Sequence, residues 1–392
     1  MSTRRTRVVI IGAGPSGLLL GQLLHKAGID NVILERQSAQ YVLDRIRAGV
    51  LEQTTVALLE QAGVATRLHA EGRVHDGVGL AFDDRLHRID LRALTGHGVT
   101  VYGQTEVTRD LMGARAAAGC LTVYEAAHVS LHDFDGERPF VRYSHEGGEH
   151  ELHGDFIAGC DGFHGVSRVS VPARALRTFE RVFPIGWLGV LAQVPPCNPE
   201  LVYASHERGF ALCSQRTPRL SRYYIQVSAG AQLGQWSDAD FWDELRRRLP
   251  GDVADAVSTG PAVEKSITPL RSFVAEPMRF GHLLLAGDAA HIVPPTGAKG
   301  LNLAASDVGY LATALREYFD ERSSAALNAY SSRCLQRVWG AVRFSCWLSA
   351  LLHRLPDATP FDRSVKSAEL DHIVRSRAAS TALAESYVGM PL

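Results

Sequence analysis

The first 35 residues contain the feature that most constrains the fold of this chain. A predicted strand, Arg7–Ile11, ends at Gly12 and is followed by a helical spacing of leucines from Ser16 to about Gly28. A second short apolar run, Asn31–Glu35, comes after the helix. Strand, glycine turn, helix and strand within about 30 residues form a βαβ unit, whose right-handed crossover makes the two strands parallel neighbours. An α/β fold with a parallel sheet is therefore expected.

The turn in this unit has the spacing of a dinucleotide-binding loop, Gly12-x-Gly14-x-x-Gly17. Gly12 permits the tight turn, Gly14 lets a pyrophosphate approach the backbone, and Gly17 lets helix and strand pack closely. The N-terminus of the helix supplies free N–H groups for the phosphates. Glu35, 18 residues beyond Gly17, stands where a carboxylate binds ribose hydroxyls. A glycine-rich turn without a ligand would leave Glu35 unexplained, so dinucleotide binding is predicted.

Two later segments also place an acid at the end of a predicted strand. Asp161 lies in Cys160–Gly162 and Asp288 lies in Ala286–His291, at the strand ends where ligands bind in open α/β sheets. The second segment leads through Pro294–Asn302 into a helix, whose N-terminus would stabilise negative charge on a reduced flavin. Either aspartate alone is more typical of a turn or a helix cap. Together with the first motif they favour FAD over a simple NAD-dependent dehydrogenase.

Composition and charge exclude several classes of protein. The 392 residues are 46% hydrophobic and 21% charged, with a net charge of -1, which is not the signature of a protein that binds nucleic acid or an anionic membrane. The segment Val8–Leu24 follows three arginines like a signal peptide, yet it is glycine-rich and precedes no clear cleavage site. No window reaches the roughly 18 unbroken apolar residues of a membrane span. Six scattered cysteines without a C-x-x-C pair fit a reducing compartment, so a cytoplasmic location is expected.

The order of the patterns predicts the domain organisation. After the first α/β segment, residues 182–227 are rich in β-branched and aromatic residues, and the α/β pattern returns at residues 283–286. From residue 301 to about 355 the pattern is helical. We expect an α/β fold: a Rossmann-like FAD-binding domain, an inserted β-sheet substrate domain and a C-terminal helical region. The expected boundaries are 1–180 and 276–310 for the FAD-binding domain, 181–275 for the substrate domain, and 311–392 for a region used in homodimerisation.

Longer stretches are more specific than the dinucleotide motif, notably Arg45–Val50 and Ile292–Ala305. With them the chain resembles the flavoprotein aromatic hydroxylases almost end to end. The resemblance is carried by Gly12–Arg36, Tyr41–Gln53, Tyr102–Met112, Ile157–His164, Gly209–Arg216, Leu283–Asp307 and Tyr387–Pro391. The sequence departs from the family mainly at Ser38–Gln40, Asp83–His87, Gly230–Gln235 and Arg316–Ser324.

The resemblance implies a set of FAD-binding residues, among which Arg47 suits the pyrophosphate because a guanidinium pairs with phosphate oxygens. The implied set is Gly12, Gly14, Ser16, Gly17, Glu35, Arg45, Ile46, Arg47, Ala48, Gly49, Val50, Gln104, Asp161, Asp288, Leu301 and Asn302. It also implies NADPH as co-substrate, bound by Arg36, Tyr41, His164 and Arg271. Because Ser38–Gln40 borders this surface and departs from the family, coenzyme preference is the property that most needs a test.

For the substrate, the resemblance implies a carboxylate site and a proton relay. Ser214, Gln215, Arg216 and Tyr224 would bind the carboxylate, and alternation along a strand puts residues 214 and 216 on one face. Tyr203, Tyr387, the carbonyl of Pro295 and His75 would serve the phenol oxygen and its proton, because a tyrosine hydroxyl both donates and accepts. Without the resemblance, Arg216 would be read as a surface ion pair and His75 as a core residue.

The function implied is that of an NAD(P)H-dependent flavoprotein monooxygenase. It would hydroxylate 4-hydroxybenzoate at position 3, giving 3,4-dihydroxybenzoate in aromatic-acid catabolism, with FAD, NADPH and O2. Two alternatives stay open: hydroxylation of another substituted benzoate, and a non-hydroxylating flavin oxidoreductase. The second would not need the carboxylate site together with both tyrosines. A sensor that had lost catalysis would show substituted relay residues, and none is apparent. No metal site is expected, since no H-E-x-x-H occurs.

Overall fold

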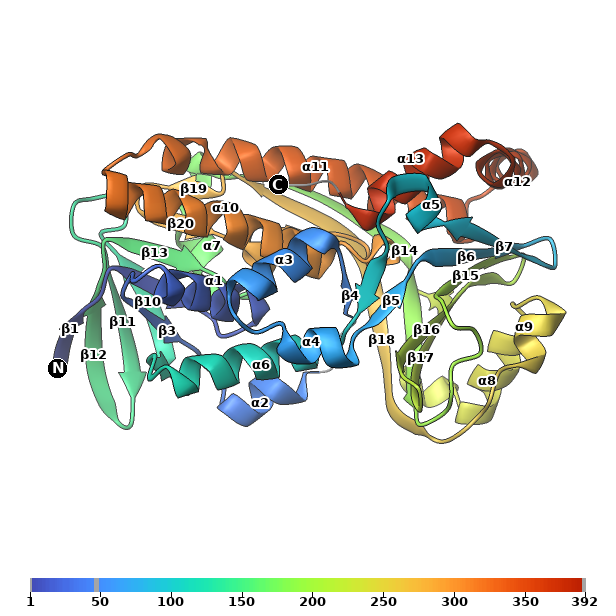
Figure 1. Cartoon of the computed structure of the whole chain (residues 1–392), viewed down its shortest axis with the longest axis horizontal. Helices are drawn as coiled ribbons and strands as arrows, with labels where there is room; N and C mark the ends of the chain where they lie inside the picture. The colour runs from blue at the N-terminus through green and yellow to red at the C-terminus, as the bar shows by residue number, and fades with distance from the viewer. Residues whose placement is uncertain (1, 46–48, 390–392) are drawn as a thin grey trace.

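The computed structural model describes residues 2–45 and 49–389 and is a mixed α/β fold, in agreement with the fold class expected from the sequence. Ile46, Arg47 and Ala48, all expected to bind FAD, lie outside the described residues, as does Pro391. The molecule is elongated, with a parallel sheet and its helices toward one end and a large antiparallel sheet at the other (Figure 1). None of the described helices is both long and apolar enough to cross a membrane.

The parallel sheet is the expected βαβ unit with further strands added on both sides. The four residues of its first strand in sequence order, Val8–Ile11, are all buried, as is typical of a parallel strand covered on both faces. All neighbouring pairs are parallel except the edge pair β19–β20. The order is β19 (Arg279–Phe280), β20 (Leu283–Leu285), β13 (Phe156–Gly159), β2 (Val8–Ile11), β3 (Asn31–Leu34) and β9 (Thr122–Val123).

The second large sheet has eight strands and is almost wholly antiparallel. Its one parallel contact joins β15 to β6. The order is β21 (His291–Ile292), β18 (Ala262–Glu276), β14 (Arg177–Ala192), β17 (Leu220–Ser228), β16 (Gly209–Thr217), β15 (Val202–His206), β6 (Gly77–Phe82) and β7 (Arg85–Asp90). Strands from residues 77–90 and 291–292 thus share a sheet with the segment expected to form the substrate domain. The division of the chain into domains remains a prediction.

The fold has two further, smaller sheets. One places β1 (Ser2–Arg5), β12 (Gly148–His153), β11 (Phe140–His145) and β10 (Ala127–His132) side by side. The other is antiparallel and consists of β4 (Val50–Leu51), β8 (Val99–Val101) and β5 (Arg73–His75). The second small sheet lies between the parallel sheet and the eight-stranded sheet (Figure 1).

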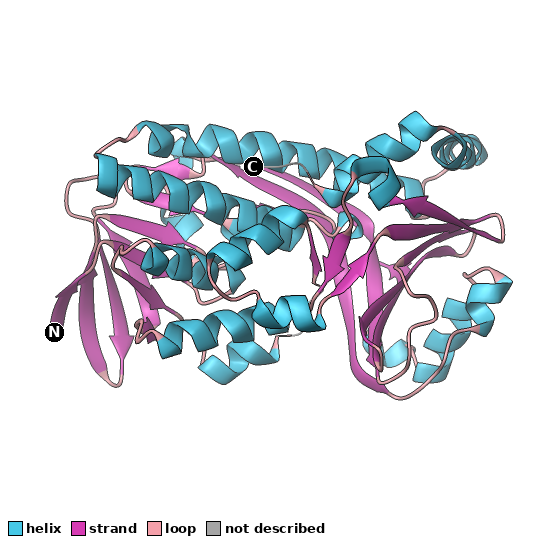
Figure 2. Cartoon of the chain, viewed as in Figure 1, coloured by secondary structure: helices cyan, strands magenta, loops and turns pink. Residues whose placement is uncertain are grey.

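Thirteen helices cover the sheets in the described part of the chain, and the long C-terminal ones run along one side of the molecule (Figure 2). The first nine are α1 (Pro15–Lys26), α2 (Ala39–Asp44), α3 (Gln53–Gln61), α4 (Thr66–Glu71), α5 (Leu91–Thr95), α6 (Gln104–Ala117), α7 (Val166–Ser170), α8 (Asp238–Arg246) and α9 (Gly251–Asp255). The last four are α10 (Gly300–Glu321), α11 (Ala325–Leu352), α12 (Pro360–Arg375) and α13 (Arg377–Val388).

Three apolar clusters hold these layers together. The first packs α1 and α10 against the parallel sheet, and its members include Leu18, Leu24 and Val308. The second joins one face of the eight-stranded sheet to the C-terminal helices and contains both Tyr203 and Tyr387. The third packs α8 against the other face of that sheet. The C-terminal helices therefore belong to the core that surrounds one face of the eight-stranded sheet.

Candidate active site

The carboxyl ends of β2 and β3 form a cradle for a dinucleotide. Gly12 has a φ of +102°, and a Cβ added there would lie 2.5 Å from the carbonyl oxygen of Cys160. A Cβ on Gly17 would lie 1.9 Å from the carbonyl oxygen of Gly12, so α1 packs directly on the turn. Gly14 differs, because a Cβ there would meet no atom within 4 Å. The open space at Gly14, beside an α1 N-terminus that no side chain caps, fits an approaching pyrophosphate.

Glu35 stands at the end of β3 and is tied to this turn. Its carboxylate accepts hydrogen bonds from the backbone N–H of Ala13 at 2.8 Å and of Gln37 at 2.9 Å. A carboxylate has about four lone-pair sites, so Glu35 keeps the capacity to accept hydrogen bonds from ribose hydroxyls. The residues that the motif predicted for the adenosine end of FAD are brought together here.

A second helix begins where the flavin end is expected. The N-terminus of α10 has Lys299 as its N-cap without a side-chain cap, and Leu301 and Asn302 lie in its first turn. The amide group of Asn302 is used within the protein: its Oδ1 accepts from the Glu52 N–H and the Thr55 hydroxyl, and its Nδ2 donates to the carbonyls of Val50 and Ala298. Asn302 therefore fixes β4 beside α10, and the free backbone N–H groups of the helix are what the fold offers to a reduced flavin.

The turn at Gly287–Ala289 lies against the same helix. The N–H of Gly287 donates to Asp307 Oδ2 at 2.9 Å, and the ring of His291 pairs with the same oxygen at 2.6 Å. Asp307 lies within α10, and the carboxyl group of Asp288 is left exposed. This arrangement presents Asp288 at the carboxyl end of β20, as the sequence predicted.

The other residues expected to bind FAD have varied surroundings. Arg45 is exposed, and its carbonyl oxygen accepts from the hydroxyl of Thr105, next to Gln104 at the start of α6. The carbonyl of Gly49 accepts from the Tyr102 N–H at 2.9 Å, and Gly49 packs against the backbone of Gln104.

Asp161 is engaged within the protein. Its Oδ2 accepts from the N–H and the hydroxyl of Ser167 in α7, and burial raises the pKa of its carboxyl group. Its Oδ1 is buried and has no hydrogen-bond partner among the described residues.

One face of the eight-stranded sheet gathers the residues expected to bind substrate. In the register, Leu212 of β16 is opposite both Tyr203 of β15 and Tyr224 of β17. Because side chains alternate between faces, Ser214 and Arg216 share the face of Leu212, Tyr203 and Tyr224. By the same alternation Gln215 is expected on the opposite side of β16, and its side chain interacts with His75. A role of Gln215 in substrate binding stays a prediction.

Arg216 is poised to bind an anion. Its Nη1 donates to the hydroxyl of Ser214 at 2.8 Å, while its Nε is buried without a hydrogen-bond partner among the described residues. Burial lowers the pKa of the guanidinium, and nearby Tyr224 opposes that shift. A buried donor left unpaired costs about 1–3 kcal/mol, which a carboxylate ligand would relieve. The donor set therefore fits a carboxylate.

Two tyrosine hydroxyls meet on the same face. The hydroxyl of Tyr203 lies 2.9 Å from that of Tyr387, and both side chains are buried. Burial raises the pKa of Tyr203 to about 12, and burial together with Tyr203 also raises the pKa of Tyr387. Both phenols are therefore protonated at neutral pH, and each can accept one proton while donating another.

Pro295 and His75 are placed less directly. The carbonyl of Pro295, in a 3-10 turn, accepts from the Ala298 N–H at 2.9 Å and retains a second lone pair. His75 is buried at the end of β5 beside the side chain of Gln215, and neither ring nitrogen makes a hydrogen bond of ordinary geometry with the described residues. Burial lowers the pKa of His75, so its ring is neutral at neutral pH. No hydrogen bond links it to either tyrosine in the described structure.

A buried ion network beside Tyr387 was not predicted from the sequence. Lys299 Nζ donates to Glu52 Oε1 at 2.6 Å and to the backbone carbonyl of Tyr387 at 2.9 Å. Arg337 of α11 reaches the other oxygen of Glu52 at 3.3 Å. The signal was a lysine within the glycine-rich segment before α10, but its partners are 247 and 88 residues away in the chain.

The four residues expected to bind NADPH form two groups. Arg36 and Tyr41 are exposed, at the end of β3 and in α2. Phe163 brings the other two together: its ring lies 5.0 Å from that of His164, and the Arg271 guanidinium lies 3.7 Å from its centroid. Arg271 also pairs with Glu180 at 3.6 Å.

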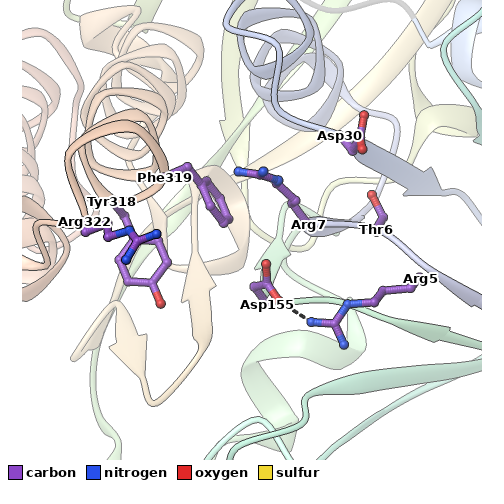
Figure 3. Close-up of a pocket in the computed structure, with 8 residues that line it drawn as sticks. All are labelled: Arg5, Thr6, Arg7, Asp30, Asp155, Tyr318, Phe319 and Arg322. Carbon is purple, nitrogen blue, oxygen red and sulfur yellow. Dashed lines mark hydrogen bonds and ion pairs between the residues drawn. The ribbon is translucent and has the colours of Figure 1, made fainter.

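An open surface pocket of about 720 Å³ lies elsewhere, at the amino-terminal ends of the parallel strands (Figure 3). Arg7, Asp30 and Asp155, which line it, immediately precede β2, β3 and β13. Ligands of such sheets bind at the carboxyl ends of the strands, and this pocket is at the amino ends. It is therefore separate from the cofactor cradle.

Comparison with known proteins agrees with this geometry. Residues 5–345 match the family model described as "FAD binding domain". The chain is 57% identical to the p-hydroxybenzoate hydroxylase of Acinetobacter baylyi, over all of this chain and 97% of that protein. It is 26% identical to a 3-(3-hydroxy-phenyl)propionate/3-hydroxycinnamic acid hydroxylase of Burkholderia cenocepacia, over 79% of this chain and 56% of that one.

Among solved structures, the p-nitrophenol 4-monooxygenase PnpA of Pseudomonas putida superposes over the full length of both chains, with a TM-score of 0.82 and 20% identity, which supports the fold. The expected cofactor FAD and the expected class of enzyme are confirmed. The chain belongs to the FAD-dependent aromatic hydroxylases, flavoprotein monooxygenases that use FAD with NAD(P)H as co-substrate.

Proposed function

We propose that this enzyme hydroxylates 4-hydroxybenzoate at position 3 to give 3,4-dihydroxybenzoate, with NADPH as reductant and O2 as oxidant. The observation that carries the proposal is that Arg216, whose buried Nε–H has no partner among the described residues, shares one face of the sheet with the Tyr203–Tyr387 hydroxyl pair. A carboxylate at one end of an aromatic ring and a hydroxyl at the other match these two features. The relative with 57% identity is a p-hydroxybenzoate hydroxylase.

The spacing along the sheet supports a para-substituted ring. Tyr203 is opposite Leu212, two residues along β16 from Ser214, which corresponds to about 7 Å. That separation is of the order of a benzene ring with a substituent at each end. A ring with its hydroxyl group at the meta position would turn this group away from Tyr203 when its carboxylate is on Arg216.

The chain's own residues prepare the ring for attack. Ser214, Arg216 and Tyr224 hold the carboxylate, which fixes the ring against the sheet. Tyr203 accepts the phenol proton as Tyr203 passes its own proton to Tyr387, and the ionised ring becomes electron-rich at the carbons next to the oxygen. The carbonyl of Pro295 is the proposed second acceptor at the phenol oxygen. When bound and reduced by NADPH, FAD would supply the electrons that activate O2, of which one atom enters the ring and the other leaves as water.

His75 is the proposed outer member of the relay. It is buried, and its pKa is lowered, so its neutral ring is ready to accept a proton. Since neither nitrogen bonds to Tyr387, the proposal requires water molecules between them.

The coenzyme surface is proposed to be formed by Arg36, Tyr41, His164 and Arg271. Two guanidiniums in this set suit the 2′-phosphate and pyrophosphate of NADPH, since guanidinium forks match phosphate oxygens. We expect faster flavin reduction by NADPH than by NADH, measured by stopped-flow absorbance with substrate bound. Equal or faster reduction by NADH would contradict the assignment.

A cytoplasmic homodimer is the proposed form of the enzyme. All six cysteines are free thiols, which suits a reducing compartment. Exposed apolar side chains occur on the C-terminal helices, among them Phe361, 76% exposed, and Val365 one turn later on α12. Sedimentation equilibrium tests the assembly, and a monomer at micromolar concentration would contradict it.

One assay separates the proposed substrate from its rivals. Oxygen uptake is measured with NADPH and, in turn, 4-hydroxybenzoate, 3-hydroxybenzoate and 4-aminobenzoate, and the products are identified by chromatography. The expected result is 3,4-dihydroxybenzoate formed from 4-hydroxybenzoate in proportion to NADPH consumed. Faster product formation from another ring acid would reassign the substrate, and oxygen uptake without any hydroxylated product would indicate a non-hydroxylating flavin enzyme.

A further inference from the structure

Two cysteines lie on the face of the eight-stranded sheet opposite to Ser214, Arg216 and Tyr224, which form the proposed carboxylate clamp. Cys213 is the residue before Ser214 on β16 and is buried, while Cys197 is half-buried in the loop after β14. That loop is fastened to β17: the hydroxyl of Ser221 donates to the Val194 carbonyl at 3.0 Å. Both cysteines pack in the apolar cluster beneath α8.

The two thiols are neighbours in this cluster. Tyr223, opposite Cys213 in the register, also reaches the loop, with its hydroxyl 3.4 Å from the Pro195 carbonyl. The Cys197 thiol lies next to the Cys213 thiol and the Tyr223 hydroxyl, close enough for these groups to shift one another's pKa. The neighbouring Cys213 thiol lowers the pKa of Cys197, whereas Cys197 and burial raise the pKa of Cys213.

The four other cysteines lack this arrangement. Cys160 and Cys334 are buried, and burial raises the pKa of each thiol. Cys346 is half-buried and hydrogen-bonds with the hydroxyl of Ser272 rather than with a second thiol. Cys120 is half-buried, at the end of the helix α6 region. Among the six, only the Cys197–Cys213 pair combines an accessible thiol with a second thiol beside it.

We propose that Cys197 and Cys213 are a peroxide-oxidised thiol pair that closes to a disulfide and weakens the carboxylate clamp. The thiolate of Cys197 attacks one oxygen of H2O2, forming the sulfenic acid and releasing hydroxide. The Cys213 thiol then attacks that sulfur, the S–S bond forms, and water leaves. The two cysteines together lose two electrons, and H2O2 is reduced to two molecules of water overall.

The oxidant is a product of this class of chemistry. When O2 is reduced at a flavin without hydroxylation of a ring, the two electrons from NADPH end in H2O2. The peroxide is released within the same protein, so the pair is exposed to it whenever turnover is uncoupled. Thiol reductants of the cell reverse the step by thiol–disulfide exchange.

The effect on the clamp follows from the position of Cys213. An S–S bond is about 2.05 Å long, much shorter than the closest approach of two sulfur atoms that are not bonded, so β16 and the loop must be drawn together. Ser214 and Arg216 follow Cys213 on the same strand and take their positions from it. Displacements of the order of 1 Å at a positioning group are costly, so the affinity for the aromatic acid falls.

The experiment uses the FAD-loaded enzyme, treated with H2O2 and then freed of it by catalase. Peptide mapping under non-reducing conditions is expected to give one major cross-linked peptide, joining Cys197 to Cys213. Titration with 4-hydroxybenzoate, followed by the flavin absorbance change, is expected to give a dissociation constant at least fivefold higher. Dithiothreitol is expected to restore both the free thiols and the affinity.

Matched variants decide the matter. Cys197→Ser is expected to bind substrate like the parent before and after peroxide, and Cys120→Ser to respond to peroxide like the parent. Oxidation mapped to Cys120 or Cys346 without the Cys197–Cys213 cross-link would overturn the proposal. So would a cross-linked enzyme with unchanged affinity. The cross-link is measured without substrate, so an error in the assigned substrate would leave that result intact.

Discussion

At the residue scale, the clamp is the part of the site most open to a direct test. Arg216 is held by Ser214 and keeps one buried donor unpaired. Replacing it in Arg216→Ala removes a charge-assisted contact of about 1.5–3 kcal/mol, so substrate affinity is expected to fall at least tenfold. Arg219→Ala, at an exposed position of the adjoining hairpin, is the control. Flavin absorbance titration measures both, and unchanged affinity in Arg216→Ala would remove Arg216 from the clamp.

The tyrosine pair makes a different prediction, on coupling rather than binding. Tyr387→Phe removes one hydroxyl from the 2.9 Å contact and keeps the ring in the core. Substrate binding and NADPH consumption are expected to persist, but a less ionised ring reacts more slowly, so more H2O2 forms per NADPH. Tyr318→Phe, at the remote pocket, is the control. Product and peroxide are measured together, and full coupling in Tyr387→Phe would refute the relay.

Part of the substrate site could be predicted from the sequence, because strand alternation alone puts Ser214 and Arg216 on one face. Resemblance supplied the pairing of Tyr203 with Tyr387, which are 184 residues apart. The ion network of Glu52, Lys299 and Arg337 escaped prediction. Its members come from three separate segments of the chain. Local spacing in the sequence does not predict their contact, because the contact forms only when the helices pack together.

At the scale of elements, two glycines of the turn between β2 and α1 have different roles: Gly17 is needed for packing, and Gly14 for ligand binding. Gly17→Ala puts a Cβ 1.9 Å from the Gly12 carbonyl, so it is expected to destabilise the protein by roughly 1–3 kcal/mol and to weaken FAD binding. Gly14→Ala meets nothing within 4 Å in the protein, so the apoprotein should melt like the parent. Its Cβ would meet the pyrophosphate instead, and FAD affinity should fall at least tenfold in a fluorescence titration. Unchanged FAD affinity in Gly14→Ala would place the pyrophosphate elsewhere.

The elements themselves were predictable where the periodicity was local. The strand at residues 8–11, the helix after it and the long helices after residue 300 follow from apolar spacing. The membership of β6 and β7 in the substrate sheet did not follow. β6 precedes its neighbour β15 by more than 100 residues, and strand pairing at that distance leaves no periodic signal. The helices α12 and α13, of which α13 carries Tyr387, lie within the region 311–392 that was expected to be helical. Their bounds did not follow from the sequence, because the clear helical pattern ended at about residue 355.

At the scale of the whole molecule, the C-terminal helices pack on the face of the eight-stranded sheet that carries Tyr203. His353 follows α11 and is buried against that sheet: its Nε2 accepts from Trp187 Nε1 at 2.6 Å, and its Nδ1–H donates to the Ser349 carbonyl at 2.8 Å. Its ring also stacks on Phe210 at 4.2 Å. This junction requires the neutral imidazole, because the nitrogen that accepts from Trp187 cannot be protonated. Assembly of sheet and helices is therefore linked to pH.

The linkage gives the last prediction. Burial lowers the pKa of His353 to about 3, against 6.5 in the unfolded chain, so below pH 6.5 the unfolded state binds the extra proton. Its contribution to the free energy of unfolding is full above pH 6.5 and is lost toward pH 3, by about 1.4 kcal/mol per pH unit between those values. His353→Gln removes the titration, so the stability gap between parent and variant should narrow as the pH falls from 6.5 to 5. Urea unfolding at fixed excess FAD measures this gap. A gap that stays constant over that range would mean that His353 is not held neutral by the packing of the helices on the sheet.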